Sequence, residues 1–175
     1  MKAPGVVVTG FMAAGKTTVG RALARLLGCA FLDLDEVVAA REGRTPQQLI
    51  DEAGEAAFRE AETSALSAAL EGDERKVVAL GGGAWTLERN RELVRARGFV
   101  SAWLDAPFEL CWERIREAGG ADRPFARDLE RARRLYDERR ASYSLADLRV
   151  GVTRGRGAQE LAAEIAARLK EARRP

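Results

Sequence analysis

The stretch Gly10-Phe-Met-Ala-Ala-Gly-Lys-Thr17 follows directly on the apolar run Gly5-Val-Val-Val-Thr9. It fits the pattern G-x-x-x-x-G-K-[ST] at every fixed position. The apolar run predicts a buried strand, and the residues from Lys16 to Leu27 carry apolar side chains at helical spacing. A loop between a buried strand and a helix N-terminus points backbone N–H groups at an anion. We therefore predict a phosphate-binding loop that holds a magnesium–nucleoside triphosphate.

Two side chains of this loop have expected roles of their own. Lys16 is placed to reach the β- and γ-phosphates, and the Thr17 hydroxyl is placed to ligate Mg²⁺. The backbone around them completes the predicted triphosphate site, whose residues are Ala13, Ala14, Gly15, Lys16, Thr17 and Thr18.

Apolar runs alternate with helical patterns along the rest of the chain. We expect strands at 5–9, 29–34, 77–80, 99–104 and 148–152. Helices are expected at 16–27, 35–41, from Pro46 onward, 54–70, from a Thr86 cap to about 97, 107–117, 129–142 and 158–173. Strands separated by helices imply right-handed crossovers and a parallel sheet covered on both faces. The predicted fold class is therefore α/β, a three-layer αβα fold with a five-stranded parallel sheet, in one domain over 1–175.

Composition excludes several classes of protein. The 175 residues are 46% apolar and 32% charged, which is ordinary for a soluble globular chain. No apolar run has transmembrane length and the N-terminus does not resemble a signal peptide, so we expect a cytoplasmic protein without membrane contact. There is no histidine, and the two cysteines, Cys29 and Cys111, are interpreted as small core residues. A net charge of +2 does not favour a nucleic-acid binder.

Three later stretches separate the possible phosphate-loop proteins. The second strand ends in Asp33-Leu-Asp35, the long helix carries Phe58-Arg59 with Glu62 one turn on, and the third strand runs into Gly81-Gly-Gly83. Together with the phosphate loop and Arg123-Pro124, they resemble shikimate kinase over nearly the whole chain. The resemblance implies a P-loop kinase fold, ATP as co-substrate, Mg²⁺ as cofactor and transfer to the 3-hydroxyl of shikimate. The residues alone indicate a small-molecule kinase whose acceptor carries hydroxyls and a carboxylate.

The two aspartates have both a functional and a structural interpretation. Asp35 lies at the carboxyl end of a strand, where open α/β sheets place their ligands. The resemblance implies that Asp35 hydrogen-bonds the acceptor hydroxyls, either as the base for the attacking one or only to position it. Asp33 is similar to the carboxylate that supports the magnesium through water. Asp-x-Asp after a strand is also a common helix cap, an interpretation of about equal weight.

The resemblance assigns the acceptor carboxylate to arginines. Arg59 resembles the clamp for that carboxylate, and Glu62, three residues later on the same helix face, supports it. Alternatively, the two form an ordinary surface ion pair. The backbone of Gly81, Gly82 and Gly83 would approach substrate hydroxyls closely. Arg140 is similar to a second carboxylate-binding arginine, with Arg139 as its competitor.

Other arginines are assigned to the nucleotide side. Arg123 matches the arginine of the family's lid, expected at about 118–128, which would stabilise charge on the transferred phosphoryl group. Arg116 and Arg154 are placed near adenine by the same resemblance. The expected substrate-binding helical segment is about 35–70.

The chain departs from the family pattern at two places. Ala13 stands where relatives usually have glycine, which would stiffen the loop if that position needs a positive φ. The lid contains Arg-Pro-Phe-Ala at 123–126, where Arg-Pro-Leu-Leu is common. These departures bear on lid kinetics more than on the identity of the substrate.

Three alternatives remain at this level. One is another small P-loop kinase, for example one for gluconate. Another is a GTPase or nucleotide switch, since Asp51-Glu-Ala-Gly54 matches Asp-x-x-Gly, although it lies in a helical stretch and no Asn-Lys-x-Asp motif exists. A non-catalytic nucleic-acid module is disfavoured by the near-neutral charge and the few aromatic residues. We expect ATP and shikimate as the partners and, as is common in the family, a monomer.

Overall fold

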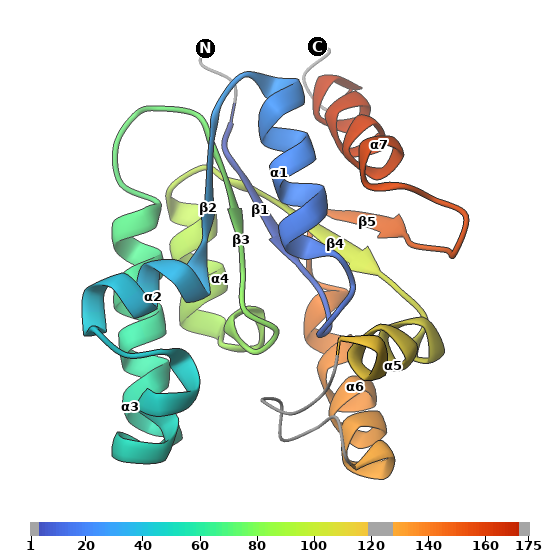
Figure 1. Ribbon diagram of the computed structural model, residues 1–175. Helices are drawn as coiled ribbons and strands as arrows, with labels where there is room; N and C mark the ends of the chain where they lie inside the picture. The colour runs from blue at the N-terminus through green and yellow to red at the C-terminus, as the bar shows by residue number, and fades with distance from the viewer. Residues whose placement is uncertain (1–3, 119–127, 172–175) are drawn as a thin grey trace.

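The computed structural model describes residues 4–118 and 128–171, and these form a three-layer α/β structure (Figure 1). Its five-stranded sheet has the order β2-β3-β1-β4-β5, and every neighbouring pair is parallel. The strands are β1 (Val6–Thr9), β2 (Ala30–Asp33), β3 (Lys76–Ala79), β4 (Val100–Asp105) and β5 (Leu148–Gly151). The predicted fold class, with five parallel strands and interleaved helices, is confirmed.

Helices connect the strands and cover the sheet. They are α1 (Lys16–Leu27), α2 (Leu34–Glu42), α3 (Pro46–Ala69), α4 (Glu88–Ala96), α5 (Phe108–Glu117), α6 (Leu129–Tyr143) and α7 (Ala158–Glu171), with a 3-10 turn η1 (Ala84–Thr86). Helices α1 and α7 pack together on one face, and α4 lies behind the sheet in the view of Figure 1. None of the helices in the described ranges has the length and apolar composition that a bilayer crossing needs.

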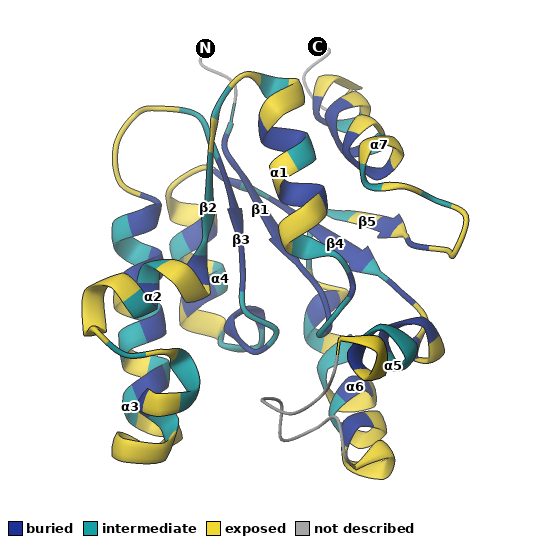
Figure 2. Ribbon diagram, in the orientation of Figure 1, coloured by how far each residue is buried: buried dark blue, intermediate teal, exposed yellow. Residues whose placement is uncertain are grey.

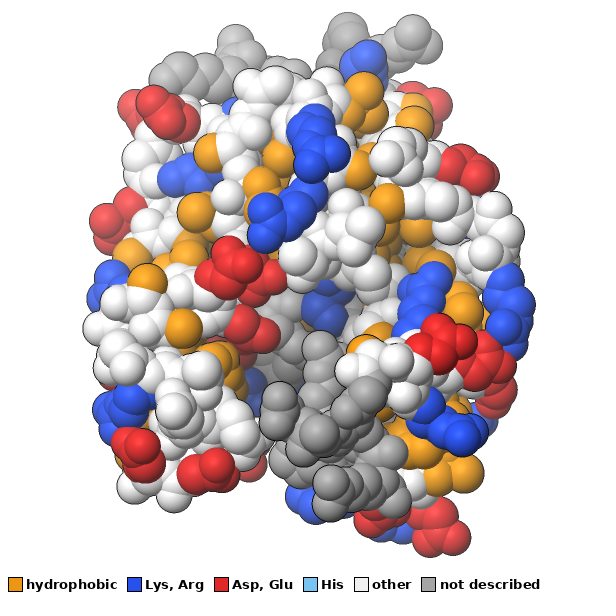
Figure 3. Space-filling model, viewed as in Figure 1, with side chains coloured by type: hydrophobic (Ala, Val, Ile, Leu, Met, Phe, Trp, Pro, Cys, Tyr) orange, Lys and Arg blue, Asp and Glu red, His pale blue; other side chains and the backbone are white. Residues whose placement is uncertain are grey.

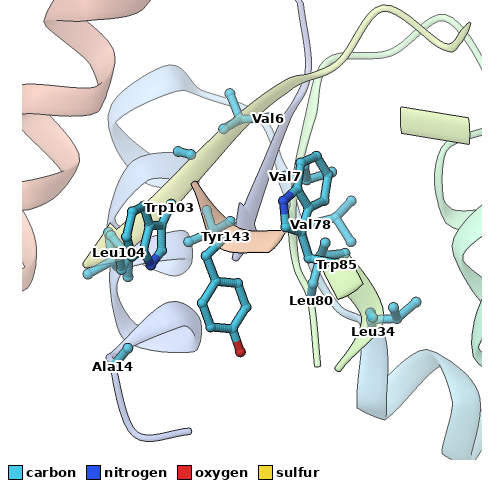
Figure 4. Close-up of a cluster of buried hydrophobic side chains, with 14 of the residues drawn as sticks. Val6, Val7, Ala14, Leu34, Val78, Leu80, Trp85, Trp103, Leu104 and Tyr143 are labelled. Carbon is cyan, nitrogen blue, oxygen red and sulfur yellow. The ribbon is translucent and has the colours of Figure 1, made fainter. Parts of the chain in front are cut away.

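The core centres on β1, the middle strand of the sheet. Val6, Val7 and Val8 are fully buried, because helices cover both faces of a parallel sheet (Figure 2). Around them pack large side chains from distant segments, among them Trp103 of β4 and Tyr143 of α6 (Figure 4). The core therefore lies directly behind the loop that follows β1.

Two predicted helix starts turned out differently. Thr86 was predicted as the N-cap of the helix that follows it, but this was wrong, because α4 begins at Glu88 after Leu87. Thr86 lies in η1, where its hydroxyl donates to the Gly83 carbonyl at 2.7 Å, since the glycine run folds back on itself. The helices expected from Pro46 and from Gly54 form one element with a break at Gly54, whose φ is 89°.

Candidate functional site

The phosphate loop has two glycines that the backbone requires. Gly10 has φ 147°, and a Cβ there would lie 2.8 Å from the carbonyl oxygen of Leu104. Gly15 has φ 102° and is the N-cap of α1. Because L side chains avoid these conformations and the space is closed at Gly10, both motif glycines are needed for the loop to reach the helix N-terminus.

Lys16 is held inside this loop. Its Nζ donates to the carbonyl oxygens of Gly10 at 2.9 Å and Phe11 at 2.8 Å. Burial lowers the pKa of Lys16 to about 8, although the negative charge of Asp35 raises it. The loop thus keeps a desolvated ammonium at the end of β1.

Ala13 adopts the left-handed conformation that the sequence comparison raised as a question. Its φ is 59°, and it is the one non-glycine residue with positive φ among residues 4–118 and 128–171. Arg114 of α5 donates to the Ala13 carbonyl oxygen at 3.0 Å and so fastens this turn of the loop. The position does need a positive φ, and an L residue there carries strain.

Replacing Ala13 by glycine is expected to raise the thermal midpoint of the unliganded protein by up to about 3 °C. A left-handed L residue costs about 1–2 kcal/mol, and glycine loses about 0.5–1 kcal/mol in chain entropy, so relief of strain prevails narrowly. The measurement is a thermal melt of the unliganded protein. Ala14→Gly is the matched control and should lower the midpoint, because Ala14 has no positive φ and is buried. A lower midpoint for Ala13→Gly would contradict the strain.

Thr17, in the first turn of α1, and Asp33, the last residue of β2, lie side by side. The Thr17 hydroxyl donates to Asp33 Oδ2 at 2.8 Å. The other Asp33 oxygen accepts the backbone N–H of Asp35 at 3.0 Å, so Asp33 also caps α2. The capping interpretation of Asp33 is therefore confirmed, and its magnesium role stays a prediction. Two neighbouring oxygens from a hydroxyl and a carboxylate fit Mg²⁺, which takes few protein ligands and completes its shell with phosphate oxygens and water.

Asp35 and Glu62 approach each other over Gly81. The strand ends at Asp33, and Asp35 lies in the first turn of α2 rather than on the strand. A Cβ on Gly81 would lie 3.0 Å from both Asp35 Oδ1 and Glu62 Oε1. Glycine at this position therefore lets two carboxyl groups meet the backbone closely.

Glu62 and Arg59 form a buried pair rather than a surface one. Arg59 Nη1 donates to Glu62 Oε2 at 2.8 Å, and only 1% of Glu62 is exposed. Burial raises the pKa of Glu62, and the charge of Arg59 opposes this shift. Among the described residues, Glu62 Oε1 has no hydrogen-bond partner. The pair is thus set into the wall of the site, and it is no ordinary surface ion pair.

The Arg59 guanidinium packs against the backbone of Gly83. A Cβ on Gly83 would lie 2.4 Å from Arg59 Nη2 and 2.8 Å from Cζ, so any side chain there would displace the guanidinium. Glu55 holds the same group from the solvent side at 3.3 Å. The glycine run, expected to approach a ligand, also shapes the position of this arginine.

The structure brings Arg139, and not Arg140, to this group. A Cβ on Gly82 would lie 3.1 Å from Arg139 Nη1. The positive charge of Arg139 contributes to the lowered pKa of Lys16 and opposes the burial that raises the pKa of Glu62. Arg140 pairs instead with Asp105 at 2.8 Å. The geometry therefore favours Arg139, the competitor, over Arg140, because successive residues on a helix point about 100° apart and α6 turns Arg139 toward Gly82.

On α5 as well, an arginine other than the predicted one reaches the site. Arg116 is exposed and lines a groove between α5 and α6, whereas Arg114 reaches the phosphate loop. Arg154 is exposed and pairs with Glu113 on the outer side of α5. Neither Arg116 nor Arg154 is brought to the phosphate loop by these contacts. Arg123 lies outside the described residues.

Sequence reasoning missed Arg114, although one signal could have found it. Arg114 is three residues after Cys111 and four after Leu110, both buried, so it borders the inward face of α5. No such signal separates Arg139 from Arg140. Arg139 lies three residues after buried Tyr136, and Arg140 lies four after it, so both border the same face.

The arrangement has two halves that meet at the carboxyl end of the sheet. One half is the loop with Lys16, Thr17 and Arg114, which suits the phosphates of a nucleotide. The other half places Asp35, Arg59 and Arg139 beside the Gly81–Gly83 turn. These side chains suit the hydroxyls and the carboxylate of an acceptor. Figure 3 shows acidic side chains bordering a recess at this end of the molecule, with a basic side chain inside it. Such a site can bring a phosphoryl donor and a small acidic acceptor together.

Comparisons with known proteins agree with this geometry. The family model described as Shikimate kinase matches residues 12–170. The chain is 41% identical over 170 residues to a shikimate kinase of Cereibacter sphaeroides, covering 95% of this chain and 81% of the relative. It is 40% identical over 169 residues to one of Geobacter sulfurreducens, covering 95% and 91%.

Solved structures give the same result. A shikimate kinase from Acinetobacter baumannii, in complex with shikimate, matches with a TM-score of 0.87 and 32% identity, covering 99% of this chain and 97% of that one. A gluconokinase from Sinorhizobium meliloti has a TM-score of 0.68 at 20% identity, which shows a shared fold only. The sequence relatives, the family model and the geometry of the site all point the same way, and the chain belongs to the shikimate kinase family.

Proposed function

We propose that this enzyme transfers the γ-phosphoryl group of ATP to the 3-hydroxyl of shikimate, giving 3-phosphoshikimate and ADP. The observation that carries the proposal is the position of Arg59 and Asp35 on one side of the Gly81–Gly83 turn, with Lys16 and the phosphate loop on the other. A carboxylate and hydroxyls on a small ring match the first pair, and a triphosphate matches the second. Membership of the shikimate kinase family supports this substrate.

On the donor side, the loop N–H groups and Lys16 bind the phosphates. Arg114 holds the loop at Ala13 and so lies beside the nucleotide. Thr17 and Asp33 are the residues that would hold Mg²⁺, Asp33 through water. When bound, the ion neutralises charge on the phosphate oxygens. The role of Arg123 in a lid at about 118–128 remains a prediction, since these residues are largely outside the described ranges.

On the acceptor side, Arg59 and Arg139 bind the carboxylate as planar two-pronged donors. Asp35 receives a hydrogen bond from the attacking hydroxyl and takes up its proton, and backbone N–H groups of the glycine turn bind the other hydroxyls. The helical segment of about 35–70 supplies Asp35, Arg59 and the supporting Glu62. Phosphoryl transfer needs little covalent chemistry from a protein, so positioning and charge stabilisation account for most of the catalysis.

A coupled assay of ADP release tests the substrate. Shikimate should raise the rate of ATP turnover by at least about a hundredfold over water alone, because the acceptor hydroxyl is oriented and water is not. Gluconate, also a hydroxylated carboxylate, serves as the matched control. Equal stimulation by gluconate would refute the shikimate assignment and favour the gluconokinase alternative, for which a shared fold is the only present support.

Affinity for MgATP is expected to fall as the pH rises above 8. The pKa of Lys16 is about 8 in the unliganded enzyme, and nearby phosphates raise it, so binding takes up a proton above that pH. The dissociation constant should rise by up to about tenfold per pH unit above 8 and stay nearly constant below 7. Calorimetry at pH 8.5 in two buffers of different ionisation enthalpy measures the proton uptake. Adenosine, which has no phosphates, is the control, and equal affinity for MgATP at pH 7 and 9 would contradict the prediction.

Family membership supports a proposal on the setting of the reaction. We place the enzyme in the cytoplasm and expect a monomer that acts on ATP and shikimate without nucleic acid or membrane. Light scattering coupled to size-exclusion chromatography checks the oligomeric state, and a dimeric mass would contradict it.

A further inference from the structure

Asp105, the last residue of β4, joins two arginines from different elements. Its Oδ1 accepts from Arg140 of α6 at 2.8 Å, and its Oδ2 pairs with Arg149 of β5 at 2.6 Å. The Asp105 side chain is only 12% exposed. Strand β4 pairs with β1 directly before the phosphate loop, so the backbone of the sheet holds Asp105 in place beside the site.

Arg140, which is half-buried, has further partners at this point. It also donates to the Tyr136 hydroxyl at 2.8 Å, and its guanidinium lies 5.1 Å from the ring centroid of Trp103. The Tyr136 hydroxyl in turn donates to the Ala106 carbonyl at 2.8 Å. These charge-assisted and neutral hydrogen bonds fasten the second half of α6 to the end of β4.

The side chain of Arg139, the preceding residue of α6, points in another direction. Its guanidinium lies beside Gly82 and hydrogen-bonds the hydroxyl of Tyr143, which itself donates to the Gly82 carbonyl at 2.6 Å. Successive residues on a helix point about 100° apart, so the rotation of α6 that seats Arg140 on Asp105 also sets where Arg139 points.

We propose that Arg140, anchored by Asp105, is a positioning residue that aims Arg139 at the carboxylate of the acceptor. The proposal rests on the proposed function, in which Arg139 binds that carboxylate. Arg149 separates positioning from general support, because it also pairs with Asp105 and lies 5.1 Å from the Trp103 centroid, but it belongs to β5. If these arginines only stabilised the fold, the loss of Arg149 would affect shikimate binding as much as the loss of Arg140.

The test measures KM for shikimate and for ATP in Arg140→Ala, with Arg149→Ala as the matched control. Arg140→Ala should raise the KM for shikimate roughly tenfold, with kcat and the KM for ATP within about twofold of wild type. Arg149→Ala should leave all three unchanged. Arg140→Lys keeps the charge but not the planar fork, and should give an intermediate KM for shikimate.

A double-mutant cycle with Arg139→Ala tests whether Arg140 affects the KM for shikimate through Arg139. In an Arg139→Ala background, the further change Arg140→Ala should alter the KM for shikimate by less than about twofold, since the group it positions is gone. Full additivity, an equal effect of Arg149→Ala, or an equal rise in the KM for ATP would each overturn the proposal. Thermal melts identify variants that fail to fold, and Arg140→Lys then carries the test.

Wild-type turnover with shikimate separates the two proposals. An inactive wild type would overturn the proposed function and this inference together. An active wild type with an unchanged KM for shikimate in Arg140→Ala would overturn the role of Arg140 alone.

Discussion

Replacing Lys16 by alanine is expected to lower kcat by at least about a thousandfold. The structure holds the Lys16 ammonium on the carbonyl oxygens of Gly10 and Phe11, inside the loop where the phosphates would lie. No other lysine lies in the loop, so the change removes a desolvated positive charge from the place where charge develops on the transferred group. The coupled assay of ADP release with saturating shikimate measures the loss.

Two controls separate lost chemistry from lost folding. Lys170→Ala makes the same change on the exposed side of α7 and should leave kcat unchanged. Lys16→Met keeps the length of the side chain without its charge and should lose activity as Lys16→Ala does. Rates near those of wild type in either Lys16 variant would refute its position on the phosphates.

Lys16→Met should lose activity, but the unliganded variant should be no less stable than the wild type. Burial lowers the pKa of Lys16 from 10.5 to about 8, so holding the charged form in the folded state costs free energy below pH 8. Between pH 8 and 10.5 the unfolded chain binds this proton and the folded chain does not, so this group makes stability rise with pH. Thermal melts at pH 7 and pH 9.5 measure it: the midpoint difference between wild type and Lys16→Met should favour the variant more at pH 7.

Replacing Arg59 by alanine is expected to raise the KM for shikimate roughly a hundredfold and leave ATP affinity within about twofold. The Arg59 guanidinium rests on Gly83 and is held by Glu62 and Glu55, an arrangement that leaves a fixed, planar donor at the acceptor side. If Arg59 binds the carboxylate as proposed, its loss removes two charge-assisted hydrogen bonds to that group. Steady-state kinetics with shikimate varied, and calorimetry with MgATP, measure the two effects separately.

Arg59→Ala also strands Glu62, which is buried and has its pKa raised by burial. Removing the positive partner of a buried carboxylate destabilises a protein, so Arg59→Lys is the second variant: it keeps the charge without the planar fork and should raise the KM for shikimate less. Arg44→Ala, which breaks an exposed ion pair with Glu52 in the same helical segment, is the matched control and should change neither constant. A fall in ATP affinity in Arg59→Ala, with the shikimate KM unchanged, would show that the clamp is misassigned.

Local pattern was sufficient for the parts of this site that lie close together in the chain. The loop from Gly10 to Thr17 joins a strand to a helix, and its own motif glycines, Gly10 and Gly15, take positive φ values. The same holds for the alternation of strands and helices, because apolar spacing reports which face of an element is buried. The left-handed Ala13 was visible as a question in the sequence, and the structure shows that the position does need a positive φ.

Partners that come from distant segments were harder to choose. Arg139 and Arg140 are neighbours that both border the buried face of α6, and the packing of Arg140 on Asp105, 35 residues away, decides between them. Arg114 reaches the phosphate loop across a separation of 101 residues. Glu62, which sequence alone could place on the surface or in the site, is buried where it lies beside Gly81 and Asp35.

The sequence by itself therefore determined the α/β fold, the phosphate loop with Lys16 and Thr17, and the pairing of Arg59 with Glu62, since each depends on periodicity or on residues within one turn of helix or loop. The tertiary structure alone decided the strand order, the inward position of Arg139 rather than Arg140 on α6, and the burial of Glu62. The position of Arg139 and the burial of Glu62 depend on the rotation of whole helices against the sheet. A few tens of degrees of rotation exchange neighbouring side chains between site and solvent, and the spacing of apolar residues does not resolve so small an angle.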